Sequence, residues 1–129
     1  MKRLVIVIAA LALAAAACGG SDDGGSSDAT AAPPGAGIAA EGERIFGETC
    51  STCHGPDAMG IEGLGKALVD NEFVQTHSDD ELVDFLRIGR LASDPLNTTG
   101  VDMPPKGGNP SLDDTDLLDV VAYVRTLQP

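Results

Sequence analysis

Two cysteines and a histidine lie within five residues, at Cys50, Cys53 and His54, in the segment Cys-Ser-Thr-Cys-His. Thiols and an imidazole at this spacing suit a redox dithiol, part of a zinc site, or the attachment site of a c-type haem. A redox dithiol normally stands beside a strand-helix-strand unit, and the sequence shows no strand pattern. A structural zinc site needs four ligands, and the one further strong candidate is His77. Haem attachment is therefore favoured, with each thiol joined to a vinyl group and His54 as an axial ligand of the iron.

The first 17 residues have the pattern of an export signal. Lys2 and Arg3 precede an uncharged run of 14 residues that ends in three alanines before Cys18. Such a run is too short to span a bilayer comfortably as a helix, which takes about 20 residues. The junction resembles the lipobox of bacterial lipoproteins, in which the cysteine is lipidated and becomes the mature N-terminus. We therefore expect a signal peptide over residues 1–17 and a lipid anchor at Cys18; a plain signal peptide with an incidental cysteine is the alternative.

Residues 18–37 are almost entirely Gly, Ser, Asp, Ala, Thr and Pro, a composition that cannot bury enough apolar surface to stay ordered. We expect a flexible linker that tethers the domain to the outer face of the bacterial cytoplasmic membrane. Acidic residues outnumber basic ones by 20 to 8, which gives a formal net charge of −12. Nucleic acid is therefore excluded as a partner, and a charged partner would be basic where it docks.

Residues 38–129 carry helical periodicity, which predicts an all-α fold. The chain has only four aromatic residues and no Trp, so a large apolar cofactor would supply bulk to the core. Two loops rich in glycine and proline, 55–65 and 91–110, need something to organise them. The expected helices are Ala39–Thr49, a short piece within Asp70–Gln75, a helix capped by Ser78 and ended by Gly89, and a last helix capped by Asp113 or Asp114.

The sequence resembles a class I cytochrome c domain of the bacterial monohaem type. Three features carry the resemblance: the Cys-Ser-Thr-Cys-His-Gly motif, the segment Met-Pro-Pro-Lys-Gly-Gly beginning at Met103, and the pattern of the last helix. The resemblance covers about Ile38 to Gln128. It implies a small cytochrome c fold around one covalently bound haem c, with Met103 at the distal-ligand position. It also implies that the first and last helices cross, where Gly42 and Phe46 on the first meet Tyr123 on the last.

A second axial ligand at Met103 would leave the iron no open position and would raise its potential. Pro104 biases Met103 towards an extended conformation and so helps to present the thioether. The rivals are Met59, His77 and no ligand; we expect Met59 to pack in a loop and His77 to be a solvated residue at a helix start. The loop after the haem motif lacks the proline that is frequent in the family, so the carbonyl that orients His54 is open.

The two basic residues Arg90 and Lys106 are candidates for pairing with a haem propionate, and solvated surface cations are the alternative. The leading functional hypothesis is a membrane-tethered one-electron carrier, not an enzyme. It would take electrons from a quinol-oxidising complex or a dehydrogenase and deliver them to a terminal oxidase or reductase. The alternatives are a haem enzyme or gas sensor whose distal Met103 is displaceable, and a binding lipoprotein without haem. Docking would use either the acidic charge or an apolar rim around the haem edge.

Overall fold

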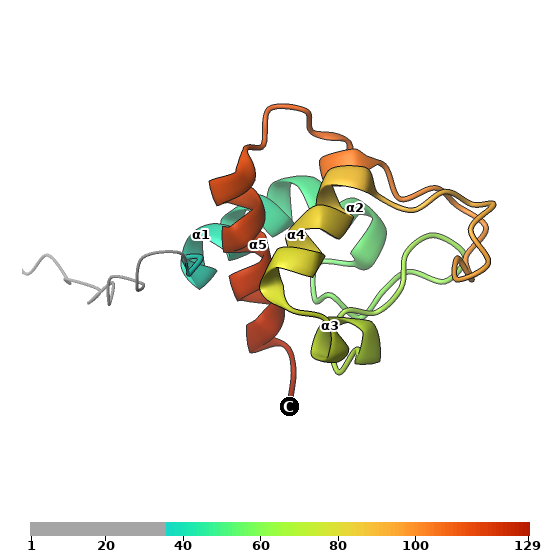
Figure 1. Cartoon of the computed structure of the whole chain (residues 1–129). Coiled ribbons are helices and arrows are strands. Elements are labelled where there is room, and N and C mark those ends of the chain that lie inside the picture. Colours follow the sequence, from blue (N-terminus) through green and yellow to red (C-terminus); the bar gives the residue numbers. More distant parts are fainter. Residues whose placement is uncertain (1–35) are drawn as a thin grey trace, which may run out of the picture.

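The computed structural model describes residues 36–129, which contain helical segments and two isolated β-bridges, and no strand within that range (Figure 1). This confirms the all-α prediction. The predicted signal peptide, Cys18 and nearly all of the predicted linker lie outside the described residues. No helix in residues 36–129 is long and apolar enough to cross a membrane. The segments in order are α1 (Ala39–Ile45), the π-helix η1 (Phe46–Cys50), α2 (Ser51–His54), α3 (Glu72–Thr76), α4 (Asp79–Ile88), the 3₁₀-helix η2 (Pro105–Gly108) and α5 (Asp114–Thr126).

The first and last helices cross closely, as the resemblance implied. A Cβ atom at Gly42 would lie 1.8 Å from the carbonyl oxygen of Asp119, so only glycine permits the two backbones this approach. One turn later, the rings of Phe46 and Tyr123 pack with their centroids 5.3 Å apart. The buried carboxylate of Asp119 accepts a hydrogen bond of 2.6 Å from the backbone N–H of Ile38, which fixes the start of α1 on α5.

The predicted helix 39–49 forms, but it does not end at residue 49. It widens into η1 and continues as α2, so that one helical run carries the chain from Ala39 to His54. The hydroxyl of Ser51 donates 2.7 Å to the carbonyl of Gly47 in the widened turn. Short π-helical turns are frequent at functional sites, and this one directly precedes the Cys-x-x-Cys-His segment.

Two capping boxes begin the longer helices α4 and α5. Ser78 accepts from the backbone N–H of Glu81, and the Glu81 side chain accepts from the N–H of Ser78. Asp113 and Asp116 make the same reciprocal pair at α5. The sequence predicted both starts, and the structure selects Asp113 as the cap. Gly89, with a φ of +72°, ends α4 as predicted.

Arg125 links α5 to the preceding helices α3 and α4, in addition to lying near the C-terminal end of α5. Its guanidinium donates to the carbonyls of Val74 and His77 and pairs with the carboxylate of Asp79 at 2.8 Å. The short helix α3 is capped by Asn71, which accepts from the N–H of Val74. The predicted helical piece is therefore present, shifted to begin at Glu72.

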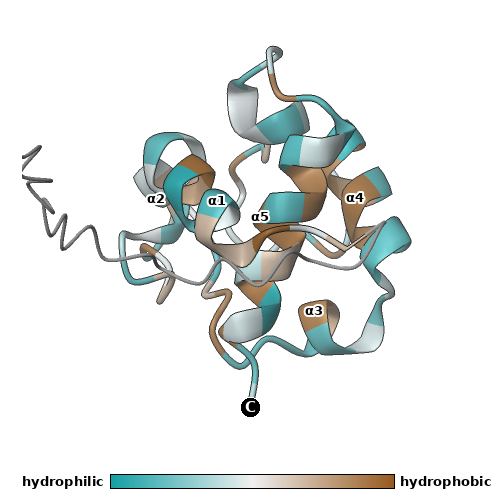
Figure 2. Cartoon of the chain, turned by 90° about the vertical axis from the view of Figure 1, so that its left-hand side faces the viewer, coloured by the Kyte–Doolittle hydropathy of each residue, from teal (hydrophilic) through white to brown (hydrophobic). Residues whose placement is uncertain are grey.

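The core lies where α1, η1, α4 and α5 meet. Figure 2 shows hydrophobic residues on the facing sides of α4 and α5 and hydrophilic residues outside. The buried apolar residues of the core include Ile45, Phe46, Leu82, Val83, Leu112, Leu117, Val120, Val121 and Val124. On one side the helices leave room for the two irregular loops, and a cavity opens there.

Candidate haem site

The two thiols come from adjacent helical segments. Cys50 ends η1 and Cys53 lies in α2, and both are half-buried, free and part of the wall of the same cavity. Residues three apart on a helix share a face, so both thiols are directed to one region. Burial, with a smaller contribution from Cys53, raises the pKa of the Cys50 thiol to about 11.

The imidazole of His54 is oriented by a backbone carbonyl. Its Nδ1 lies 2.7 Å from the carbonyl oxygen of Lys66; because a carbonyl only accepts, Nδ1 carries the proton and Nε2 is left as the free donor of an electron pair. The N–H of Gly60 donates 2.8 Å to the His54 carbonyl. A Cβ at Gly65 would lie 2.3 Å from the Cys53 carbonyl oxygen, so the loop rests directly on α2. The carbonyl that orients His54, which the sequence did not identify, is that of Lys66.

Met103 reaches the same cavity from a separate segment. Its backbone N–H donates 2.8 Å to the Arg90 carbonyl, and its own carbonyl accepts 2.9 Å from the Arg90 N–H. Gly89 lies so close that a Cβ there would be 2.1 Å from the Met103 carbonyl oxygen. Pro104 and Pro105 follow in extended and 3₁₀ conformations. Met103 is half-buried and lines the cavity together with His54.

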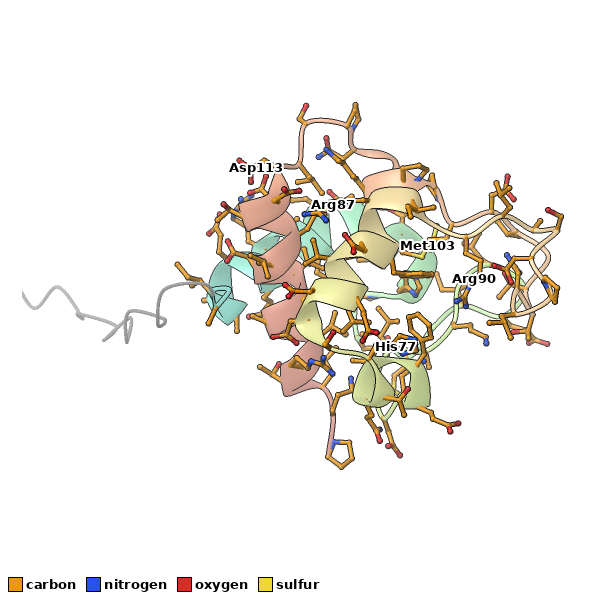
Figure 3. The ribbon with its side chains drawn as sticks, in the orientation of Figure 1. His77, Arg87, Arg90, Met103 and Asp113 are labelled. Carbon is orange, nitrogen blue, oxygen red and sulfur yellow. The ribbon has the colours of Figure 1, made fainter. Side chains whose placement is uncertain are left out.

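Arg90 lies beside Met103 at the cavity (Figure 3). Its guanidinium carbon is 5.0 Å from the ring centroid of Phe73 and 4.8 Å from that of Phe85, which is a double cation–π arrangement. The side chain is 16% exposed, and its Nε is buried without a hydrogen bond, 3.7 Å from the carboxylate of Asp94. Lys106, the other predicted propionate partner, also lines the cavity, but its ammonium donates 2.6 Å to the carbonyl of Leu112.

The rivals of Met103 do not line the cavity. Met59 is 59% exposed in the loop after α2, so it lies in a loop as predicted but packs little there. The prediction of a solvated His77 is wrong in part: the ring is half-buried, 4.0 Å from the centroid of Phe73, with Nδ1 2.8 Å from the Phe73 carbonyl. The aromatic ring of Phe73 explains this, because it covers one face of the imidazole.

The cavity has the chemistry of a site for an apolar, metal-bearing group. Its open volume of about 180 Å³ is several times that of a water molecule, and its wall is mainly apolar. Two cysteines, one histidine and one methionine line it, together with Arg90, whose buried Nε lacks a hydrogen bond. Within residues 36–129, no three side chains from His, Cys, Asp and Glu gather as a conventional metal centre. The residues present fit a covalently attached haem.

Some residues that build the site carried no readable signal in the sequence. Asn71 caps α3, donates 2.6 Å to the Ala67 carbonyl and lines the cavity. Asn97 makes hydrogen bonds across the loop before Met103. Asparagine is common in loops of every kind, so only the fold distinguishes these two.

Comparison with known proteins identifies the class of domain. The sequence model of the family described as cytochrome c oxidase, cbb3-type, subunit III matches residues 37–124. The subunit CcoP of the cbb3-type cytochrome c oxidase of Rubrivivax gelatinosus is 31% identical over 88 residues, which are 68% of this chain and 25% of that protein. The subunit FixP of Bradyrhizobium sp. (strain ORS 278) is 30% identical over 88 residues, 68% and 30% of the two chains.

The CcoP subunit of Rhodobacter capsulatus is 30% identical over 90 residues, which are 69% of this chain and 29% of that protein. The matched part is thus between about a quarter and a third of these relatives. No solved structure matches this chain at a significant level. The matched range contains every residue of the candidate site.

Proposed function

Because this chain belongs to the family of cbb3-type cytochrome c oxidase subunit III, we propose that it carries one haem c, bound through Cys50 and Cys53, and passes single electrons to a respiratory terminal oxidase. The observation that supports this most directly is the meeting of the two thiols, His54 and Met103 in one apolar cavity. These residues come from η1, from α2 and from the second irregular loop, which is far from the other two in the sequence and meets them only in the folded chain.

In this proposal each residue has a distinct task. The two thiols would hold the haem covalently, as thioethers to its two vinyl groups. His54 would present Nε2 to the iron, with its ring orientation fixed by the Lys66 carbonyl. Met103 would present its thioether, and the apolar wall would limit the access of water and so favour the less charged, reduced state. A bound haem supplies one-electron exchange between ferrous and ferric iron.

Arg90 is the proposed partner of a propionate. Its guanidinium is held by Phe73 and Phe85 at the cavity edge, with a buried Nε that lacks a hydrogen bond. A carboxylate there would complete the hydrogen bonding of this nitrogen. Lys106 is less suited, because its ammonium already donates a hydrogen bond to the Leu112 carbonyl.

The haem is tested by spectroscopy. A pyridine haemochrome spectrum of the purified protein, with haem staining after denaturing electrophoresis, should report one haem that stays on the polypeptide. Colour extracted by acidified organic solvent would contradict covalent attachment. A reduced-minus-oxidised spectrum that does not change with carbon monoxide would support the carrier; a clear carbon monoxide adduct would favour a haem enzyme or gas sensor with a displaceable Met103.

The proposed partners are suggested by the relatives, and the proposed location by the N-terminal sequence. Three relatives are named as subunits of a cbb3-type cytochrome c oxidase, so a terminal oxidase is the proposed electron acceptor, with a quinol-oxidising complex or a dehydrogenase as the donor. We also propose that the chain is exported and anchored through a lipid on Cys18. Cys18→Ala should release the protein from membranes; retention after a high-salt wash would place the anchor elsewhere.

A further inference from the structure

The twelve residues between Arg90 and Met103 form a loop, and its two ends are joined by the Arg90–Met103 pair, which we call the neck. Two backbone hydrogen bonds between Arg90 and Met103 form a β-bridge at the neck, and two turn hydrogen bonds, from Asp94 N–H to Leu91 and from Asn97 N–H to Asp94, lie within the loop. Leu91 and Leu96 are 65% and 64% exposed. Leu91 is not among the residues that line the cavity, whereas Leu96 and Val101 are, so part of the apolar surface of this loop borders the haem site. Ordering a loop of this length costs conformational entropy at every residue, so other contacts must fix it.

Asn97 supplies those contacts from the middle of the loop. Its Nδ2 donates 3.1 Å to the Leu91 carbonyl and 2.8 Å to the Val101 carbonyl. Its Oδ1 accepts from the N–H groups of Thr99 and Gly100, at 3.0 and 2.9 Å, and from the Thr99 hydroxyl at 3.2 Å. One half-buried amide thus uses both of its donors and its acceptor within a single loop.

The two donor bonds are the ones that matter for the site. They reach both limbs of the loop, at Leu91 directly after Arg90 and at Val101 two residues before Met103. Asp102 adds a second link between the limbs, because its carboxylate accepts from the N–H of Ala92. The neck is also tight, since Gly89 touches the Met103 carbonyl. A loop opened at Asn97 would therefore release the pair that carries Met103 and Arg90.

We propose that Asn97 is a positioning residue for Met103: by joining the two limbs of the 91–102 loop it holds the Arg90–Met103 pair, and with it the thioether, at the cavity. This rests on the proposed role of Met103 as the distal ligand. Asn97 itself lines the cavity. Its proposed role is to keep the loop closed, so that the thioether of Met103 leaves the cavity less often.

The first test uses the haem-loaded full chain and imidazole as a competing ligand. In Asn97→Ala, imidazole should bind the ferric protein about tenfold more tightly than in wild type, or more, because two or more hydrogen bonds that oppose release are lost. Asn97→Asp keeps the acceptor and loses both donors, so it should shift imidazole binding in the same direction. This second variant also serves if the alanine variant does not fold.

Two controls separate positioning from general destabilisation. Ser78→Ala removes the cap of α4, at the end of the helix away from Gly89, and lowers stability without touching the loop. Ser93→Ala changes an exposed loop residue whose side chain makes no hydrogen bond within residues 36–129. Neither should change imidazole affinity. The backbone N–H of Met103 is hydrogen-bonded to Arg90, and its exchange with solvent should be about tenfold faster in the Asn97 variants. The reference is Ser78→Ala, compared under conditions in which the variants have the same free energy of unfolding.

The outcomes are distinct. If wild type has a haem spectrum but no near-infrared band of iron–sulfur ligation, Met103 is not the ligand, and both this inference and that part of the proposed function fail. If wild type has the band and both Asn97 variants keep wild-type imidazole affinity and Met103 exchange, the inference alone is overturned. Faster exchange and tighter imidazole binding in both variants, with both controls unchanged, supports it.

Discussion

The crossing of α1 and α5 and the loops around the cavity are held in different ways. At the crossing, Gly42 lets two backbones touch, and buried apolar side chains fill the space around it. Around the cavity, positions are set by single polar contacts, such as the Lys66 carbonyl on His54 and the Asn97 amide across its loop. A change at the crossing should therefore cost stability, whereas a change in the loops should alter the haem environment more than the stability.

The largest effect is expected at Gly42. Gly42→Val would place Cβ within 1.8 Å of the Asp119 carbonyl oxygen, which is backbone and cannot yield without parting the helices. We expect the free energy of unfolding to fall by about 3 kcal/mol or more, measured by chemical denaturation of the haem-loaded protein. Gly47→Ala is the matched control, because a Cβ there meets nothing within 4 Å. It should be neutral or stabilising, and an equal loss in both variants would remove the packing argument.

Met103→Ala should change the electronic properties while the protein remains folded. The thioethers and His54 would still hold the haem, so helical circular dichroism should be retained. The near-infrared iron–sulfur band should vanish, and the potential should fall by roughly 0.1 V or more, part of the roughly 0.8 V range that axial ligands cover. For one electron this is about 2.3 kcal/mol. Survival of the band would point to another ligand.

A smaller effect is expected at Arg90. Arg90→Lys keeps the charge but loses the planar group between Phe73 and Phe85, which should cost about 1–2 kcal/mol of stability. Arg87→Lys is the comparison, because Arg87 pairs only with exposed carboxylates of Asp84 and Asp114. Equal melting temperatures for the two variants would show that the stacking contributes nothing.

The charge of the whole molecule should appear in kinetics. The whole chain has a net charge of −12. The protein should therefore transfer electrons to a basic acceptor at a rate that falls steeply as salt rises, since the Debye length shrinks to about 8 Å at physiological salt. The rate with an acidic acceptor should rise. Stopped-flow measurements across ionic strength test this, and a rate independent of salt with the natural partner would favour docking through an apolar rim.

The smallest effect concerns the surface link between α4 and α5. Arg87, 2.9 Å away, holds the pKa of Asp114 below its usual range. The link therefore contributes above the ordinary pKa of a carboxyl group, near 3.9, and is lost as the pH falls through the lower folded value. Asp114→Asn should lower the melting temperature by about two degrees at pH 7, and the gap to wild type should narrow as the pH is lowered below about 3.9. A gap that stays constant would mean that another contact is responsible.

What could be predicted from the sequence follows the same division. The caps Ser78 and Asp113 were readable because a capping box is local, and its residues lie three apart. The Gly42 contact came with the family resemblance. The carbonyl that orients His54 was not predictable, since every residue has one and only the path of the loop selects Lys66. Asn97 likewise acts across its loop, on partners that no local pattern specifies.

The π-helical turn η1 sets the rotation of the residues that follow it relative to α1. Each residue of an α-helix turns the chain by about 100°, so one surplus residue between Phe46 and Cys50 rotates everything after it relative to the face that α1 presents to α5. Removing a single residue there would preserve the crossing while turning Cys53 and His54 away from the cavity. The number of residues in this segment is thus tightly constrained.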